Sequence, residues 1–225
     1  MFCQKCGTQV PDNTVTCSNC SASVAASNPS ALAADKVKAA SKDAFQAFKM
    51  FASNPVAGLS VAFESLGQAR ALGVGIIFGA LFALCVVFGA YRLLPEWGRP
   101  QGFSRFIKIL VVAIVPFFSL LGATVLGRKT FRGEGGFGHD SFIAGASLLP
   151  FGFVALVAGI LGLGNIEVIA VFTLFAVCLT ILMLFAGLTR ICKTSERSAT
   201  IAVPLMLIAS AWLSKIIYTA MLKEL

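Results

Sequence analysis

Charge is scarce in this 225-residue chain. Charged residues make up 12% of it and hydrophobic residues 57%, whereas a soluble domain usually carries about 25% charged residues. One histidine and two tyrosines stand against 20 phenylalanines and 21 glycines, and the mean hydropathy is +0.87. These shortages exclude an ordinary water-soluble globule, a disordered tail and a collagen-like repeat. They indicate a chain that lies in lipid.

Groups for catalysis are also scarce. Catalysis needs titratable residues that converge, and the single histidine, His139, follows a glycine-rich segment and precedes Asp140. Just before that segment stand three basic residues, Arg128, Lys129 and Arg132. Glycines and basic residues could hold a phosphate or a lipid headgroup. The favoured interpretation is a flexible loop whose charges set topology, with His139 and Asp140 as ordinary polar loop residues. We predict no catalytic residue and no enzymatic activity.

Charged and histidine side chains are absent from five long apolar runs, residues 71–91, 109–127, 141–166, 168–189 and 198–214. About 20 residues cross the hydrocarbon layer as a helix, so each run is long enough, the last one marginally. The runs lack the alternation of a membrane β-barrel. The sequence therefore predicts an all-α membrane protein with a five-helix transmembrane bundle. Ion-coupled transport has little support, because it needs ionisable groups at mid-membrane depth.

Four of the seven cysteines form two CxxC pairs, Cys3 with Cys6 and Cys17 with Cys20. Two such turns supply the four thiolates that Zn²⁺ prefers in closed structural sites. We predict one structural Zn²⁺ per chain, bound by these four cysteines. Two disulfides or a single-iron site are the alternatives, and no cleavable signal peptide precedes Cys3 to indicate an oxidising compartment.

The remaining cysteines, Cys85, Cys178 and Cys192, lie in or beside apolar runs. We interpret them as small buried apolar residues.

The segment between the cysteine pairs and the first apolar run divides in two. Residues 21–28 are small and polar, which indicates a linker. Residues 29–70 follow, with Asn28-Pro29 and Asn54-Pro55 as predicted helix starts, in which Asn is the cap and Pro the first helical residue. Apolar residues recur there at helical spacing, at Val37, Ala40, Ala44, Phe48 and Phe51, then at Val56, Leu59, Phe63 and Leu66. The predicted organisation is therefore a zinc ribbon (1–20), a linker (21–28), amphipathic interfacial helices (29–70) and a five-span domain (71–225).

Orientation follows from the distribution of lysine and arginine. Twelve of these residues lie before the first run or in the loops after the second and fourth runs, and five lie in the segments on the other side. We expect the chain to lie in the cell's inner membrane. The positive-inside rule places the amino terminus and the zinc site on the cytoplasmic side and the carboxyl terminus on the outer side.

Helix contacts leave two further patterns. Gly75-x3-Gly79 and Ala155-x3-Gly159 are small-x3-small patterns that let helix backbones approach closely. Three prolines, Pro116, Pro150 and Pro204, lie inside the second, third and fifth runs and predict kinks or local openings.

Two family resemblances rest on these motifs. The order Cys3-x-x-Cys6-Gly7 followed by Cys17-x-x-Cys20 resembles the short zinc ribbons at the start of many bacterial membrane proteins. Residues 54–222 resemble the Yip-type domain, named for proteins that interact with Ypt/Rab GTPases. That second resemblance rests on Asn54-Pro55, five closely spaced runs, a glycine-rich loop and Pro150. It implies a multi-pass, non-enzymatic membrane protein with a cytoplasmic amino-terminal region.

The leading functional hypothesis is a non-enzymatic scaffold or membrane-organising protein whose zinc ribbon docks another protein. Its expected partners are the lipid bilayer, a cytoplasmic or membrane protein and, as one option, further copies of the chain, but not nucleic acid. The alternative is a transporter or channel through the helices that contain proline.

Overall fold

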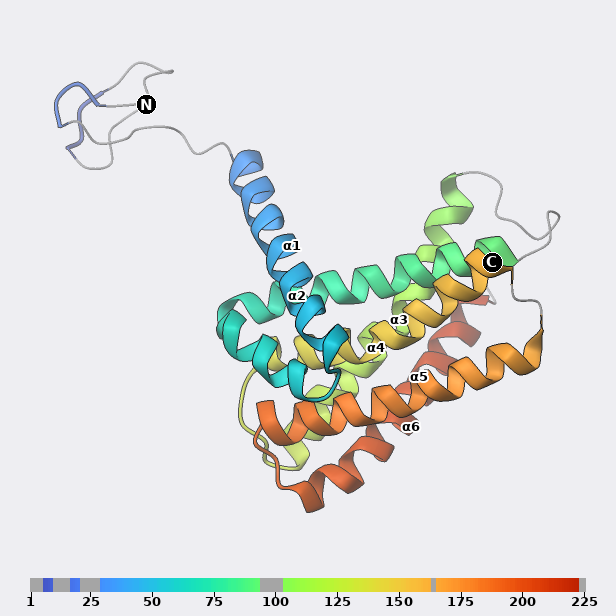
Figure 1. Cartoon of the computed structure of the whole chain (residues 1–225). Coiled ribbons are helices and arrows are strands. Elements are labelled where there is room, and N and C mark those ends of the chain that lie inside the picture. Colours follow the sequence, from blue (N-terminus) through green and yellow to red (C-terminus); the bar gives the residue numbers. More distant parts are fainter. Residues whose placement is uncertain (1–5, 10–16, 21–28, 94–102, 163–164, 223–225) are drawn as a thin grey trace. The chain divides into compact units, whose positions relative to one another are not determined.

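The computed structural model of the chain describes residues 6–9, 17–20, 29–93, 103–162 and 165–222. The described residues form six α-helices and one π-helical turn (Figure 1). The elements are α1 (Pro29–Ser53), α2 (Ala57–Leu93), α3 (Phe103–Thr130), α4 (Phe137–Leu161), α5 (Ile166–Ala186), η2 (Gly187–Ile191) and α6 (Glu196–Leu222). The predicted all-α class is therefore confirmed.

The chain divides into two compact units, Met1–Ala39 and Ala40–Leu225, and the division falls inside α1. The first unit contains the cysteine pairs, and the second contains the long apolar helices. The proposed linker, residues 21–28, and one proposed metal ligand, Cys3, lie outside the described residues.

Within the described part of the chain, five helical segments are long and apolar enough to cross a membrane, as the sequence predicts. They are Ala57–Leu93, Ile109–Thr130, Phe137–Leu161, Ile166–Ile191 and Glu196–Ala220. The third span differs from its predicted run of 141–166. Helix α4 begins at Phe137, so His139 and Asp140 lie in its first turn rather than in a loop. It ends at Leu161, because Gly162 adopts a left-handed conformation with a φ of 62°.

The fifth span is longer than its 17-residue run. Helix α6 continues through Lys215 to Leu222. Helices α3, α4 and α6 also continue through Pro116, Pro150 and Pro204. The prolines therefore lie inside helices, and the kinks or local openings expected at them stay a prediction.

The α1–α2 connection follows the predicted capping chemistry. The Asn54 side-chain oxygen accepts a hydrogen bond from the Ala57 amide at 3.0 Å, and the Asn54 carbonyl accepts one from the Gly58 amide at 2.8 Å. Gly58 is required here, because a Cβ atom would collide with the carbonyl group of Met50 in α1. The helix pair therefore turns back tightly on itself.

Helix α2 has two parts that meet at Gly67. This residue has φ 68° and ψ 168°, a conformation that only glycine adopts readily. Before it, Leu59 and Leu66 of the predicted stripe are buried together with Ala62, whereas Val56 and Phe63 of that stripe are half-buried. In α1 the buried face is formed by Ala44, Ala47 and Phe51, whereas Val37 and Phe48, predicted on the stripe of this helix, are 63% and 40% exposed.

Helices α2 and α4 touch through their backbones. A Cβ atom on Gly145 would collide with the Gly75 carbonyl, and one on Gly159 would lie 2.6 Å from the Gly89 Cα atom. Between them, a Cβ atom on Gly152 would lie 3.2 Å from the Phe82 Cα atom. The three pairs are each separated by the same 70 positions, so α2 and α4 run parallel and meet every two turns.

The small-x3-small patterns are used in different ways. Ala155 and Gly159 both meet Gly89 of α2, as the pattern predicts. Gly75 faces Ser141 and Gly145 of α4, but Gly79 faces the Phe117 ring of α3. One glycine pair therefore holds α2 against two different helices.

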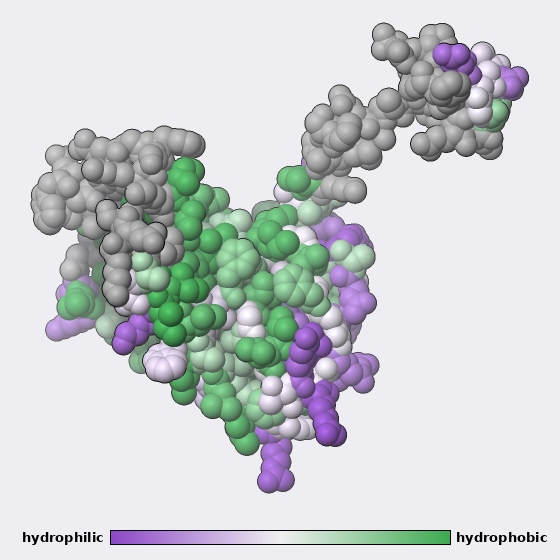
Figure 2. Space-filling model, turned by 180° about the vertical axis from the view of Figure 1, so that it is seen from behind, coloured by the Kyte–Doolittle hydropathy of each residue, from purple (hydrophilic) through white to green (hydrophobic). Residues whose placement is uncertain are grey.

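Apolar side chains cover much of the outside of the Ala40–Leu225 unit. Figure 2 shows hydrophobic side chains over most of the visible face and hydrophilic ones along its edges. Val171 and Trp212, on α5 and α6, are 68% and 69% exposed. Such a surface is costly in water and suits hydrocarbon.

The three lone cysteines differ in burial. The interpretation of them as small buried residues is right for Cys192, which is buried. Cys85 is half-buried, and Cys178, on α5, is exposed.

The glycine contacts give a first test. Gly145→Ala should destabilise the helix bundle by about 1–3 kcal/mol, because the added methyl group has no space between α4 and α2. Gly122→Ala is the matched control, since nothing lies within 4 Å of a Cβ atom at that α3 position. The control should leave stability unchanged or raise it slightly. Unfolding midpoints in detergent measure both, and equal midpoints would contradict the packing described here.

Candidate functional site

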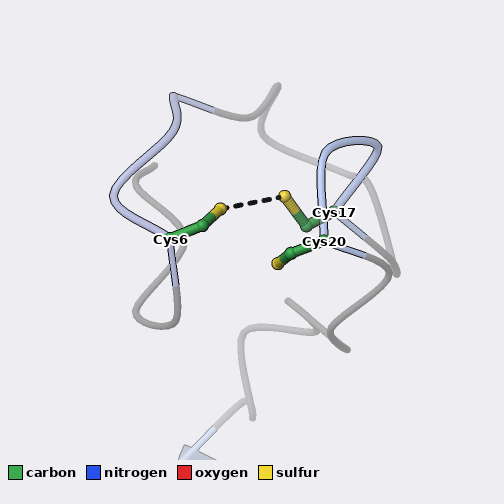
Figure 3. Close-up of side chains that lie close together, drawn as sticks. All are labelled: Cys6, Cys17 and Cys20. Atoms are coloured by element: carbon green, nitrogen blue, oxygen red, sulfur yellow. Dashed lines mark hydrogen bonds between the residues drawn. The ribbon is translucent and has the colours of Figure 1, made fainter.

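Three cysteines of the two CxxC pairs converge in the Met1–Ala39 unit. The sulfur atoms of Cys6, Cys17 and Cys20 all lie within 4.8 Å of one another, and Figure 3 shows the three side chains turned toward a common centre. The Cys6 and Cys17 sulfurs are 3.6 Å apart. Cys17 is buried, and Cys6 is exposed.

Hydrogen bonds tie the two cysteine turns together. The Thr8 hydroxyl oxygen accepts a hydrogen bond from the Asn19 side-chain amide at 3.0 Å and lies 3.3 Å from the Cys6 sulfur. Gly7, directly after Cys6, has a φ of 71°, which glycine adopts without strain. Contacts outside the thiols therefore orient Cys6 relative to the second turn, as the surroundings of metal ligands commonly do.

The sulfur spacing fits a tetrahedral metal site. Zinc–sulfur bonds of about 2.3 Å place tetrahedral ligands about 3.8 Å apart, close to the Cys6–Cys17 distance of 3.6 Å. A disulfide needs a sulfur–sulfur distance of about 2.05 Å. The described thiols therefore match the zinc prediction better than the disulfide alternative.

A second group of polar residues lies at one end of the Ala40–Leu225 unit, where residues 131–136 and 192–195 meet. We call it the charged end. Its centre is an ion pair between Arg128, on the last turn of α3, and Asp140, on the first turn of α4. The Arg128 Nε and Nη2 atoms donate to the Asp140 carboxylate at 2.9–3.0 Å. Their side chains are only 11% and 1% exposed, so each charge depends on the other.

The loop between α3 and α4 is held by specific contacts. Arg128 Nη1 donates to the Gly135 carbonyl at 2.9 Å, and the Glu134 amide donates to the Cys192 carbonyl at 2.7 Å. The Lys193 ammonium lies 3.1 Å from the Glu134 carboxylate. The favoured interpretation of a flexible loop with topology-setting charges is therefore incomplete, because these charges also bind the two loops together.

Backbone conformation supports the same conclusion. Arg132 and Lys193, one in each loop, have φ values of 55° and 50°. Non-glycine residues keep such a conformation only where their surroundings enforce it.

His139 caps α4 and does not pair with Asp140. Its Nδ1 atom accepts a hydrogen bond from the Gly136 amide at 3.2 Å, which assigns the ring hydrogen to Nε2. Its ring lies 4.7 Å from the Phe63 ring of α2, measured between centroids. Phe63 in turn contacts Phe142 at 5.6 Å. The imidazole is therefore fixed between the start of α4 and the first part of α2.

Cys192 is enclosed beside this ion pair. Burial, helped by the nearby Asp140 carboxylate, raises the pKa of the Cys192 thiol to about 12. At neutral pH the thiol is therefore protonated and a poor nucleophile.

A cavity of about 330 Å³ opens at the charged end. We call it the interfacial cavity. Its lining residues come from α2, the α3–α4 loop, α4, η2 and the segment after it: Ser60, Phe63, Glu64, Gln68, Glu134, Gly135, His139, Arg190, Ile191 and Lys193. The cavity is small and polar, and its lining contains two carboxylates and two cationic side chains.

Only indirect signals in the sequence point to this group. The basic residues and the glycine-rich segment were visible, but the pairing of Arg128 with Asp140 spans a turn whose shape no local pattern specifies. Glu64 and Arg190, 126 positions apart in the chain, are brought to one cavity by tertiary packing alone.

The buried ion pair gives a second test. Asp140→Asn should lower the free energy of unfolding by about 3–5 kcal/mol, because it leaves the Arg128 charge buried without a counter-charge. Glu134→Gln should have little effect, since its pair with Lys193 is exposed. Replacing both partners, as Arg128→Met with Asp140→Leu, should recover much of the loss. Equal effects of the two single substitutions on the unfolding midpoint would contradict this account.

Comparisons with known proteins identify the amino-terminal part. Residues 2–24 match the family model of the zinc-ribbon domain, which agrees with the converging cysteines. No curated protein and no solved structure matches the chain. The Yip-type resemblance of residues 54–222 stays a prediction. The chain thus combines a zinc-ribbon segment with five helices that are long and apolar enough to span a membrane.

Proposed function

We propose that this protein is a non-enzymatic membrane scaffold that anchors a zinc-ribbon docking module at the membrane surface. The observation that carries the proposal is the separation of the metal-binding segment from the spanning helices. The cysteines belong to Met1–Ala39, a compact unit distinct from Ala40–Leu225. A ribbon with its own fold can bind a partner without taking part in the packing of the membrane helices.

The metal chemistry supports docking rather than catalysis. A fourth thiolate from Cys3 would complete a tetrahedral set with Cys6, Cys17 and Cys20, and four protein ligands leave no position for a substrate. Bound Zn²⁺ would stabilise the fold of a segment too short to bury a core. The surface it holds in shape is then available to a protein partner.

Four titratable groups at the charged end, Arg128, Asp140, His139 and Cys192, are already engaged in structure. Arg128 neutralises the Asp140 carboxylate, and His139 Nδ1 caps α4. The thiol of Cys192 is buried, with a pKa raised to about 12. These assignments favour a structural use of the site over acid–base or nucleophilic catalysis.

A transporter or channel is the second candidate. The observation that bears on it is a cavity of about 610 Å³ beside Pro150 and Phe153, lined almost entirely by apolar residues of α1, α4 and α5. Such a lining suits a hydrocarbon chain and offers no ligands to an ion. We therefore rank transport below the scaffold role.

The proposed orientation places the zinc ribbon and the charged end in the cytoplasm. The loops after α3 and η2 meet at one end of the unit. These loops and the helix ends beside them contain six basic residues: Arg128, Lys129, Arg132, Arg190, Lys193 and Arg197. Reporters fused before Met1 and after Leu225 should therefore respond on opposite sides of the membrane, the first in the cytoplasm. Both reporters on one side would contradict five spans.

Metal content and docking can be tested together. The purified protein should carry about one Zn²⁺ per chain by elemental analysis. Cys17→Ser should remove it, because Cys17 is the buried member of the three converging thiols. If the ribbon docks a partner, crosslinking in native membranes should capture that partner with the parent protein and lose it with Cys17→Ser.

Cys178→Ser is the matched control, since Cys178 is an exposed residue of α5 far along the chain from the ribbon. It should keep both the metal and the partner. Iron in place of zinc would contradict the metal assignment. A partner that is still captured after the metal is lost would contradict docking through the ribbon.

A further inference from the structure

The interfacial cavity lies at the charged end, beside the start of α4 and the end of the π-helical turn that follows α5. Its walls are the first part of α2, the first turn of α4 and the π-helical turn η2. The Glu134–Gly135 segment also lines the cavity, and it belongs to the loop that Arg128 and Asp140 hold in place. Its volume of about 330 Å³ is at the small end of ligand sites. That size suits a small polar group.

Two charged side chains of the cavity lack partners within the described part of the chain. Lys193 and Glu134 pair with each other at 3.1 Å. Glu64, from α2, and Arg190, from η2, have no such ion pair or hydrogen bond among the described residues. One carboxylate and one guanidinium therefore face a common space without neutralising each other.

The π-helical turn explains how Arg190 reaches this space. Gly187, at the start of η2, packs on the Ile143 side chain of α4, where a Cβ atom would lie 2.7 Å from an Ile143 methyl carbon. Such turns are frequent at functional sites. Here the turn brings the end of the fourth span against α4 and adds Arg190 to the cavity wall.

The histidine adds a third polar group. Because His139 Nδ1 accepts from the Gly136 amide, its Nε2–H remains to donate. Gly135 packs closely against the ring, since a Cβ atom there would lie 2.6 Å from Cδ2 and 2.9 Å from Nε2, and the ring lines the cavity. The lining thus combines donors that suit phosphate oxygens, Arg190 and His139, with an acceptor that suits an ammonium group, Glu64.

We propose that the interfacial cavity binds a phosphoethanolamine group. Arg190 and His139 donate hydrogen bonds to the phosphate oxygens, and the ammonium group donates to Glu64. A zwitterion fits better than a simple anion, because the two carboxylates and two cationic residues of the lining balance. The position at the ends of the spans favours a phospholipid headgroup as the source, and free phosphoethanolamine is the other source.

The test uses the full-length protein, delipidated in detergent, and measures lipid binding by native mass spectrometry. The probes are phosphatidylethanolamine, phosphatidylcholine and phosphatidylglycerol with matched acyl chains. Phosphatidylethanolamine should bind most tightly. Glu64→Gln should weaken that binding about tenfold and abolish the preference over phosphatidylcholine, because it removes a charge-assisted hydrogen bond to the ammonium group. Arg190→Gln should weaken binding of all three lipids by a similar factor.

The matched controls are Glu196→Gln and Arg197→Gln, which neutralise exposed residues at the start of α6, outside the cavity lining. They should leave binding unchanged. All four positions are exposed, so folding should be preserved, and an unchanged unfolding midpoint checks this.

A competition arm separates the two sources. If free phosphoethanolamine at millimolar concentration displaces the lipid from the parent protein but not from the Glu64→Gln variant, the site recognises the group itself. If it does not compete and lipid binding still depends on Glu64 and Arg190, the acyl chains contribute and the lipid is the source. Equal binding of phosphatidylethanolamine and phosphatidylcholine would overturn the proposal. So would binding that is insensitive to both substitutions.

Discussion

The backbone contact between α2 and α4 is the constraint on which the rest of the membrane part depends. Glycines at 75 and 89 in α2 and at 145, 152 and 159 in α4 remove the side chains that would keep the helices apart. Lipid provides no hydrophobic force between helices, so close van der Waals packing of this kind drives their association. The contact also fixes the depth of the α4 start relative to α2. That depth places His139 beside Phe63.

The charged end is built on this alignment. With α4 set against α2, Asp140 reaches Arg128 at the end of α3, and the Arg128 side chain then holds the Gly135 carbonyl. Glu134 and Gly133 in turn meet the segment that follows η2, at Cys192 and Thr194. Four elements thus converge through one buried ion pair. A cavity with unpaired charges can persist there because its walls are fixed by contacts that do not involve those charges.

Much of this organisation could be predicted from sequence, where the signal is local. Apolar run length predicts five spans, because the thickness of the bilayer sets the length of each helix. CxxC spacing predicts a metal cluster, because ligand geometry is set within a few residues. Asn54 predicts a cap for the same reason. The sequence does not predict the ends of α4. Gly162 lies inside the apolar run, which continues past the helix end, and Phe137 lies among glycines that indicate a loop.

The site required information that is not local. The adjacent residues His139 and Asp140 could form a pair, yet they bind different groups. His139 accepts a hydrogen bond from the Gly136 amide, and Asp140 accepts hydrogen bonds from Arg128. Phe48 was predicted on the buried stripe of α1, but Ala47 is buried in its place. Small residues such as alanine occupy the buried positions where helices pack closely. Which residues of α1 are buried depends on the helix that packs against α1, and the α1 sequence alone does not identify that helix.

The equal spacing of the α2 and α4 contacts limits how these two helices can change in evolution. Each residue turns a helix by about 100°. One residue gained or lost between Gly75 and Gly89 would therefore rotate every later contact away from its partner. An isolated loop tolerates a change of length, whereas here a compensating change in α4, at the matching level, would be needed. We therefore expect the lengths of these two segments to change only together, whichever residues fill the positions that face outward.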